Sequence, residues 1–380
     1  MRRYCAVPLA ALLTLGSAGC REGLAPFTPA EREVGGASYG LTFGYGQDAD
    51  PQWTSSGDSI LYHTTEFTTV PQVEGVLLAI SVSGGHAVPV FADLQTPGSR
   101  PFATPALSPD GERLAYFDMM GVDMPHECVR TGNETCAPQP LLDSAVLRVR
   151  SLGEQGSISD DPAVPVRFAG TDPGSRTVTA GPWFQQLFPF QAQHRHEHGM
   201  LFRPSWAPDG ERITFSDGLA IRIWEVGAES STVIPGTADG VSAAWSPDGE
   251  WIAYSQVART DSVVQQCSCA VGTKSTWVFR TVYDAGPGTL VLVRPDGSER
   301  VELGEGRDPA WSPDGSFLFV RRGYEIYRIA RDSGEAVPID DTIGGRAPAV
   351  SPDGRRLAFS RAKPGQLIRD YDIWIVSLDQ

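Results

Sequence analysis

Short runs of alternating apolar and polar residues recur along the chain, each directly after a cluster of turn-forming residues. Such runs start at Leu114, Ile213, Ile252, Leu318 and Leu357. Alternation with a period of two is typical of β-strands that bury one face. Each cluster has the form Ser-Pro-Asp-Gly or close to it, and these residue types suit the successive positions of a tight turn. The pattern therefore predicts strand, turn and strand, repeated through the chain.

The clearest copy of the repeat runs from Asp308 to Gly315 and reads Asp-Pro-Ala-Trp-Ser-Pro-Asp-Gly. The other copies start at Pro51, Pro105, Pro204, Ser242 and Pro348, and the first of them is degenerate. Trp206 and Trp245 lie about 39 residues apart, which is the length of one four-stranded propeller blade. We predict an all-β fold, a six-bladed β-propeller that occupies residues 38–380.

Closure of the predicted propeller involves both ends of the chain. The strand signal at 38–43 precedes the first repeat, where other blades have the fourth strand of the preceding blade. The last strand signal, 371–378, is a third strand with no fourth strand after it. We therefore expect the N-terminal strand to complete the last blade, which removes the free sheet edges.

The aspartate of each repeat has two interpretations. Turn chemistry explains every copy, because aspartate suits the third position of the turn. Alternatively, six aspartates could form a ring of acids or ligands on one face. We favour the turn interpretation.

The Trp-Ser-Pro-Asp-Gly repeat resembles the WD-related repeats of the TolB-like β-propeller family. Similar repeats occur in the propellers of prolyl oligopeptidases, dipeptidyl peptidases and oligogalacturonate lyases. The resemblance covers roughly residues 38 to 380 and implies the fold rather than an activity, because propellers carry many unrelated sites. TolB also has an N-terminal α/β domain, for which this chain has no room.

The N-terminus has the features of an export signal. Arg2 and Arg3 precede a short apolar run, and Ser17-Ala18-Gly19 supplies small residues before Cys20. Residues 1–19 resemble a bacterial lipoprotein signal peptide, although Ser17 stands where Leu is usual. Cys20 would then be the lipidated first residue of the mature protein, and residues 20–37 a tether. An ordinary secretory signal is the alternative.

Three insertions interrupt the repeat, near 119–144, 171–200 and 259–288. Two of them join the second and third strands of a blade, and one joins two blades. Because both kinds of connection lie at the same end of an up-and-down blade, we expect all three on one face, over blades two to four. Long loops on a rigid scaffold often carry function.

The second insertion holds the main candidate residues for binding. Its aromatic side chains could anchor a partner or dock as a lid; they are Trp183, Phe184, Phe188 and Phe190. Just beyond lie three histidines, His194, His196 and His198, which are weak candidates for a metal site. A metal there would favour a metal-dependent polysaccharide lyase or hydrolase on the propeller. From the sequence we assign no catalytic residue and no cofactor.

Four cysteines lie in the insertions, Cys128 and Cys136 in the first and Cys267 and Cys269 in the third. In an exported protein they are candidates for two disulfides. A bridge between Cys267 and Cys269 would be strained, which favours links between the insertions.

The formal net charge of −15 disfavours binding to nucleic acid or to anionic lipid surfaces. From the export signal we expect a protein that is periplasmic or at the cell surface, is monomeric, and touches the membrane only through an N-terminal lipid. The resemblance to TolB implies the role of a binding scaffold in the cell envelope, with a protein or a glycan as partner.

Overall fold

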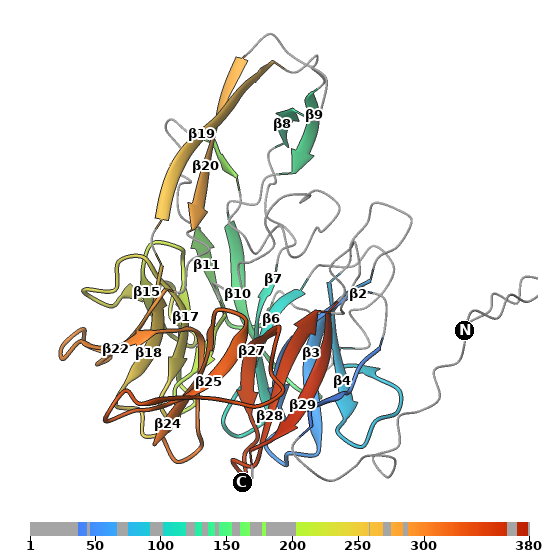
Figure 1. Cartoon of the computed structure of the whole chain (residues 1–380). Coiled ribbons are helices and arrows are strands. Elements are labelled where there is room, and N and C mark those ends of the chain that lie inside the picture. The colour runs from blue at the N-terminus through green and yellow to red at the C-terminus, as the bar shows by residue number, and fades with distance from the viewer. Residues whose placement is uncertain are drawn as a thin grey trace, which may run out of the picture.

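The computed structural model describes residues 37–43, 46–66, 75–91, 102–118, 126–130, 136–140, 144–153, 160–167, 177–179, 203–257, 259–268, 275–283, 288–362 and 371–378. Strands arranged around a central axis make up most of this part of the chain (Figure 1). Within these ranges, no helix is long and apolar enough to cross a membrane.

Six antiparallel blades form a β-propeller, so the predicted fold class is confirmed. A parallel bridge between Gln47 and Tyr371 joins blades one and six in one sheet. Blade one comprises β2 (Gly46–Trp53), β3 (Ser59–Glu66), β4 (Gly75–Ser81) and β5 (Val88–Pro89). Blade two comprises β6 (Phe102–Leu107), β7 (Arg113–Asp118), β10 (Ser144–Ser151) and β11 (Ala163–Arg167). Blade three comprises β13 (Ser205–Trp206), β14 (Arg212–Ser216), β15 (Ile221–Glu225) and β16 (Thr232–Val233).

The remaining blades repeat this order. Blade four comprises β17 (Gly240–Trp245), β18 (Ile252–Gln256), β21 (Thr289–Val293) and β22 (Val301–Glu305). Blade five comprises β23 (Arg307–Trp311), β24 (Phe317–Arg322), β25 (Glu325–Ala330) and β26 (Ala336–Pro338). Blade six comprises β27 (Gly345–Val350), β28 (Arg356–Ala362), β29 (Tyr371–Ser377) and β1 (Tyr39–Gly40).

The N-terminal strand closes the propeller, as predicted. β1 pairs with β29 antiparallel, with Tyr39 opposite Ile375. The first strand of every blade also contacts the first strands of both neighbouring blades, in the cyclic order β2, β6, β13, β17, β23, β27. These six inner strands therefore surround the axis as a closed ring.

The Ser-Pro-Asp-Gly clusters form the turns between first and second strands. In blade five, the Ser312 hydroxyl donates to Asp314 Oδ1 at 2.6 Å, and the same oxygen accepts the backbone N–H of Ser316 at 3.0 Å. Gly315 closes the turn with a positive φ of 71° and donates to the Ser312 carbonyl at 2.9 Å. These bonds lower the pKa of Asp314. The aspartate is thus a turn residue here, in agreement with the favoured interpretation.

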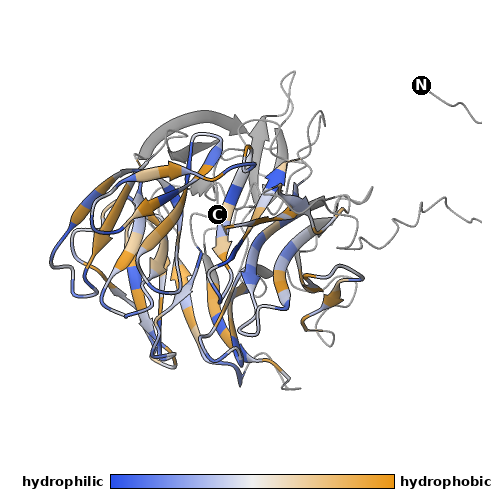
Figure 2. Cartoon of the chain, turned by 60° about the horizontal axis from the view of Figure 1, so that its bottom comes forward, coloured by the Kyte–Doolittle hydropathy of each residue, from blue (hydrophilic) through white to orange (hydrophobic). Residues whose placement is uncertain are grey.

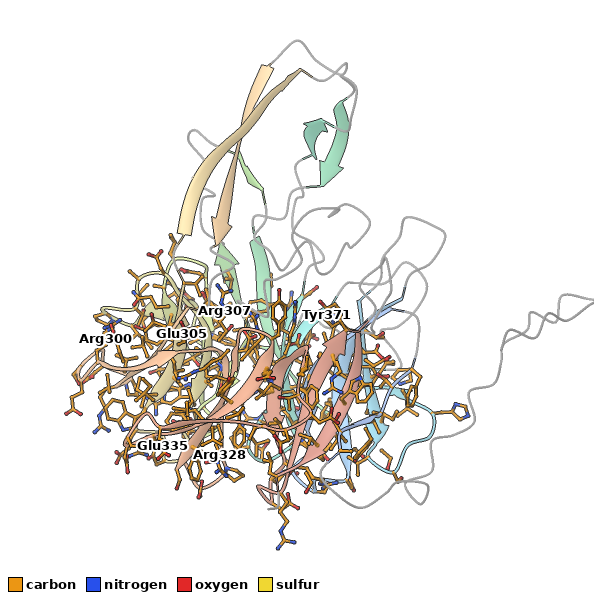
Figure 3. The ribbon with its side chains drawn as sticks, in the orientation of Figure 1. Arg300, Glu305, Arg307, Arg328, Glu335 and Tyr371 are labelled. Carbon is orange, nitrogen blue, oxygen red and sulfur yellow. The ribbon has the colours of Figure 1, made fainter. Side chains whose placement is uncertain are left out.

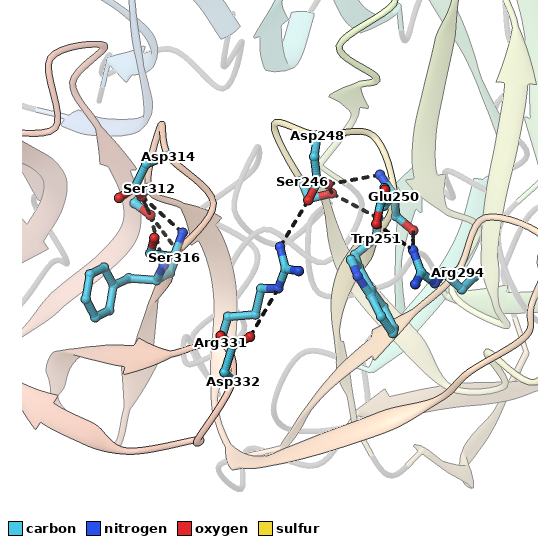
Figure 4. A network of polar contacts seen from close by, with 11 residues as sticks. Ser246, Asp248, Glu250, Trp251, Arg294, Ser312, Asp314, Ser316, Arg331 and Asp332 are labelled. Carbon is cyan, nitrogen blue, oxygen red and sulfur yellow. Dashed lines mark hydrogen bonds and ion pairs between the residues drawn. The ribbon is translucent and has the colours of Figure 1, made fainter.

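Neighbouring turns are linked through charged side chains (Figure 4). Arg331 of blade five lies 3.0 Å from the carboxylate of Asp248 in the blade-four turn. Arg294 reaches Glu250 beside the same turn at 3.0 Å and stacks over Trp251. The arginines are about three-tenths exposed and the acids more so, so each link stabilises only weakly.

In three blades the repeated tryptophan forms a hydrogen bond to the blade before it. Trp206 Nε1 donates to the Ala106 carbonyl of blade two at 2.8 Å, and Arg113 of blade two stacks over the indole ring at 4.9 Å. The same bond is made by Trp53 to Ala349 and by Trp311 to Ala244. The acceptor is always the residue before the tryptophan position of the preceding blade. The repeat motif therefore specifies contact between blades as well as the turn.

The hydrophobic core lies between the blades. Apolar residues follow the strands, and polar residues dominate the connecting turns (Figure 2). Packing between blades two and three, for example, involves Phe117 and Phe215 with their rings 6.3 Å apart edge to face, and Trp224 fully buried beside them. Such side chains bury large apolar areas, which is the main source of propeller stability.

Candidate functional site at the insertion-bearing end of the axis

Strands from the three insertions meet above blades two to four (Figure 1). β8 (His126–Arg130) and β9 (Cys136–Pro140) form a hairpin between β7 and β10. β19 (Arg259–Ser268) and β20 (Ser275–Tyr283) form a longer hairpin between β18 and β21. β12 (Thr177–Thr179), from the connection between blades two and three, pairs in parallel with β20, and β8 contacts β19. Segments far apart in the sequence thus build a second layer of strands.

The candidate residues of the insertions fall largely outside the described side chains. Trp183, Phe184, Phe188, Phe190 and the histidines His194, His196 and His198 lie outside the described residues, as do Cys20 and Cys269. Cys128, Cys136 and Cys267 belong to β8, β9 and β19, where only the backbone is described. In the β8–β9 register, Cys128 lies opposite Pro138 and Cys136 opposite Arg130, so the two cysteines are diagonal rather than directly paired.

Five of the six inner strands carry a β-bulge three residues before the tryptophan position. The strand register shifts between Ala49 and Gln52 in blade one and at the equivalent place in blades two, four, five and six. The bulged residues have positive φ: Asp50 at 58°, Thr104 at 49°, Ser242 at 53°, Asp308 at 54° and Ala347 at 47°. Arg203 occupies the corresponding sequence position of blade three. We refer to these six residues as the axial ring.

The axial ring lies toward the end of the axis that carries the insertions. Each inner strand starts at the end where the chain arrives from the previous blade, and each second strand finishes there. β19 follows β18 at this end. Arg307, which directly precedes Asp308, lies on the side of the propeller nearest the insertions, whereas Glu335 lies on the opposite side (Figure 3).

Asp50 has the most unusual environment of the ring. Its side chain is completely buried, and neither carboxylate oxygen has a hydrogen-bond partner among the described residues. Burial raises the pKa of Asp50 to about 7; Arg203 opposes this shift and Asp308 adds to it. A buried ionised carboxylate without partners is costly, so the neutral form is favoured. Asp50 can therefore exchange a proton near neutral pH.

Arg203 is the one member of the ring that is partly exposed. Its Nη2 donates one long hydrogen bond, 3.5 Å, to the Pro51 carbonyl in blade one. Blade two separates blades three and one, so this hydrogen bond joins two blades that are not direct neighbours. Desolvation lowers the pKa of Arg203, an effect that Asp50 and Asp308 partly offset. Within the described part of the chain, no carboxylate lies at ion-pair distance from its guanidinium.

Asp308, in contrast, is held by neighbours in its own and the preceding blade. Its Oδ1 accepts a hydrogen bond from the Ser242 hydroxyl at 3.2 Å, and its Oδ2 lies 3.5 Å from Arg321 Nε. The side chain is only 3% exposed. The two acids of the ring therefore differ: Asp308 has a cationic and a hydroxyl neighbour, and Asp50 has neither within contact distance.

The sequence marks the position of this ring with a proline, which the turn and strand patterns alone do not explain. A proline stands two residues before the tryptophan position in five blades, as Pro51, Pro105, Pro204, Pro309 and Pro348. Proline has no N–H to give to a sheet ladder and is tolerated at bulges. The residue before each of these prolines is a ring member, so the proline marks the ring position in five of the six blades.

The chemistry of the ring is that of a charged binding site. It combines the guanidinium of Arg203, which makes one long hydrogen bond among the described residues, with the carboxyl group of Asp50 and the hydroxyl groups of Thr104 and Ser242. Among the described residues, no group of three histidine, cysteine or acidic side chains is placed to hold a metal ion. The backbone strain recurs in five blades with different side chains, so it belongs to the scaffold, and the specific chemistry comes from Asp50 and Arg203.

The sequence matches no protein-family model and no curated protein. Several solved β-propellers have similar folds. The putative TolB of Agrobacterium tumefaciens matches with a TM-score of 0.48 and 14% identity over 88% of this chain and 91% of that chain. Oligogalacturonate lyase of Vibrio parahaemolyticus matches with a TM-score of 0.43 and 13% identity over 93% and 96% of the two chains. At this level the similarity concerns the propeller fold, and function has to be argued from the site.

Proposed function

We propose that this chain is an exported, lipid-anchored β-propeller that binds a protein or a glycan in the cell envelope through its insertion-bearing face. The observation that carries the proposal is the pairing of β12 with β20, which joins two insertions in one sheet outside the blades. Short turns suffice for the corresponding connections of blades three and five, at Gly218 and Gly323.

The second layer of strands is not needed to close the propeller. The six inner strands form a complete ring, and β1 completes the last blade. Ordering long insertions costs conformational entropy that closure alone does not require. A role in recognition accounts for this structure, because binding sites are commonly built from long loops on rigid scaffolds.

Export and anchoring are supported by the sequence of residues 1–20. A Cys20→Ala variant should lose membrane association and remain in the soluble envelope fraction. Recovery of this variant in the membrane fraction, in the same proportion as the wild type, would contradict lipid anchoring at this residue.

The binding role is tested by trimming the face that carries the insertions. One variant replaces residues 181–198 by a short Gly/Ser loop, and a second joins Val257 to Gly288 by a tight turn. Cross-linked envelopes are then compared for partners captured by each variant and by the wild type. The matched control shortens residues 154–159, which join β10 and β11 at the opposite face.

We expect both trimmed variants to lose captured partners and the control to keep them. Each variant must retain the far-ultraviolet circular dichroism and unfolding midpoint of a folded propeller. Unchanged capture by both trimmed variants would refute the proposal and direct attention to the metal content and to polysaccharide substrates.

A further inference from the structure

Arg203 presents hydrogen-bond donors that the propeller does not use. A guanidinium has five N–H donors in a planar fork. Within the described residues, Arg203 makes only the 3.5 Å bond to the Pro51 carbonyl. The other five members of the ring, Asp50, Thr104, Ser242, Asp308 and Ala347, are all buried. A ligand approaching along the axis would therefore meet Arg203 first.

We propose that the axial ring binds the C-terminal carboxylate of a peptide chain through the guanidinium of Arg203, next to the buried carboxyl group of Asp50. The two coplanar oxygens of a carboxylate match the fork of a guanidinium. This inference rests on the proposed function, because it assigns the ligand chemistry of the same face.

A chain end fits this position better than a group in the middle of a polymer. Six inner strands surround the axis, and the ring is accessible only at Arg203. A ligand has to enter end-on, as the terminus of an extended peptide does. Capture of a chain terminus by a small polar site is a known mode of peptide recognition. A uronic acid carries its carboxylate on a sugar ring, which is bulkier than the end of an extended peptide.

The protonation of Asp50 controls whether Arg203 is available. When Asp50 is neutral, the nearest ionised acid of the ring is Asp308, which already has Ser242 and Arg321 as neighbours. When Asp50 is ionised, it attracts Arg203 and competes with a ligand carboxylate. Binding of the peptide should therefore be favoured at acidic pH.

Most other charged groups on the strands of these blades have interactions of their own. These strands include Asp48, His63, Asp118, Arg307, Arg321, Arg346, Arg361 and Asp372. His63 differs, because its Nε2 has no hydrogen-bond partner among the described residues. Arg203 and Asp308 are the groups whose charges shift the pKa of Asp50. Burial lowers the pKa of His63 to about 4, so this side chain stays neutral over the range in which Asp50 titrates.

The test follows the side-chain Nε–H signal of Arg203 by NMR in the full-length protein labelled with ¹⁵N-arginine. The signal is assigned by its loss in Arg203→Gln. The probes are N-acetyl-alanyl-alanine with a free carboxylate and the same peptide with a C-terminal amide. Glucuronate serves as a third probe for a carboxylate on a sugar. Arg328→Gln is the control variant, because Arg328 lies at the opposite side of the propeller, stacked on Phe317 (Figure 3).

We expect the free peptide to shift the Arg203 signal and the amide to leave it unchanged. The apparent dissociation constant should rise roughly tenfold from pH 6 to pH 8, because only protein with neutral Asp50 binds. Arg203→Gln should abolish binding, Arg328→Gln should leave it intact, and Asp50→Asn should bind with the same affinity at both pH values.

Equal binding of the acid and the amide, binding retained by Arg203→Gln, or an affinity of the wild type that is independent of pH would overturn the proposal. Binding of glucuronate without binding of the peptide would overturn it as well. The variant trimmed at residues 181–198 separates the two ideas. If it loses its envelope partner but still binds the peptide acid, the insertions recognise the partner and the ring binds the carboxylate. If both trimmed variants keep the partner while the wild type fails to bind the peptide, both proposals are wrong.

Discussion

Two tryptophans of the repeat differ in one hydrogen bond, which allows the contact between blades to be measured. Trp206 and Trp245 are 7% and 5% exposed, and an arginine of the preceding blade stacks 4.9 Å from each ring. Trp206 Nε1 donates to the Ala106 carbonyl at 2.8 Å, whereas Trp245 Nε1 has no partner among the described residues. We predict that Trp206→Phe destabilises the protein more than Trp245→Phe.

The expected difference comes from the hydrogen bond alone. Both substitutions remove the same atoms from sites of similar burial, so their transfer and cavity costs largely cancel. Trp206→Phe also leaves a buried carbonyl without its donor, which costs about 1–3 kcal/mol. Trp245→Phe removes a buried N–H that lacks a partner, so its own cost should be smaller. Trp311→Phe, which loses a 3.1 Å bond to Ala244, should behave like Trp206→Phe.

The measurement is urea unfolding followed by far-ultraviolet circular dichroism, with midpoint and slope fitted for each variant. Slopes have to agree before free energies of unfolding are compared. Equal losses of stability in Trp206→Phe and Trp245→Phe would refute the reasoning, since the indole N–H would then contribute nothing to holding the blades together.

Three further predictions concern charged and titratable groups. Asp50→Asn should stabilise the protein at pH 8 but not at pH 4: the folded-state pKa of about 7 lies above the unfolded value of 3.8, so stability is lost as pH rises through 7, on the order of 4 kcal/mol at most. His63→Leu should remove an acid sensitivity: its folded-state pKa of about 4 lies below 6.5, so stability falls as pH drops from 6.5 toward 4, by about 3 kcal/mol at most. Both are checked by unfolding midpoints as a function of pH, and unchanged pH profiles would contradict them. Arg356→Ala should lower the free energy of unfolding by about 1–2 kcal/mol. Arg356 of blade six stacks 4.6 Å from the Trp53 ring of blade one and donates to the Gly57 carbonyl at 2.8 Å, so it joins the two blades where the ring closes. Arg355→Ala, one residue away and without these contacts, is the control in the same urea titration.

The architecture could be predicted from local signals that recur. Each Ser-Pro-Asp-Gly turn needs a glycine with positive φ, as at Gly315, and places an alternating strand on either side. The missing fourth strand after Tyr371–Ser377 and the extra strand signal before the first repeat determined how the ring closes. Such information is local, and repetition makes it reliable.

The axial ring could not be recognised in the same way, because its chemistry depends on residues that repetition does not share. The same position holds Asp50, Thr104, Arg203, Ser242, Asp308 and Ala347. The charge state of Asp50 depends on Arg203 and Asp308, which are distant in the sequence and meet only when the ring closes. Because this position differs from blade to blade, the sequence alone does not show that its residues meet in the closed fold.

The positions of the insertions and the charges of the ring point to the same end of the molecule. At the opposite end, the turn aspartates have hydrogen-bond partners, as Asp314 shows with its bonds to Ser312 and Ser316. At the insertion-bearing end, polar groups of Asp50 and Arg203 lack strong partners among the described residues. A buried carboxyl group that gains nothing from its surroundings lowers stability, so its presence is better explained by binding than by folding. The propeller would then supply a rigid ring, and the insertions would supply the surface around it. Arg203 would bind the ligand, and Asp50 would control that binding through its protonation.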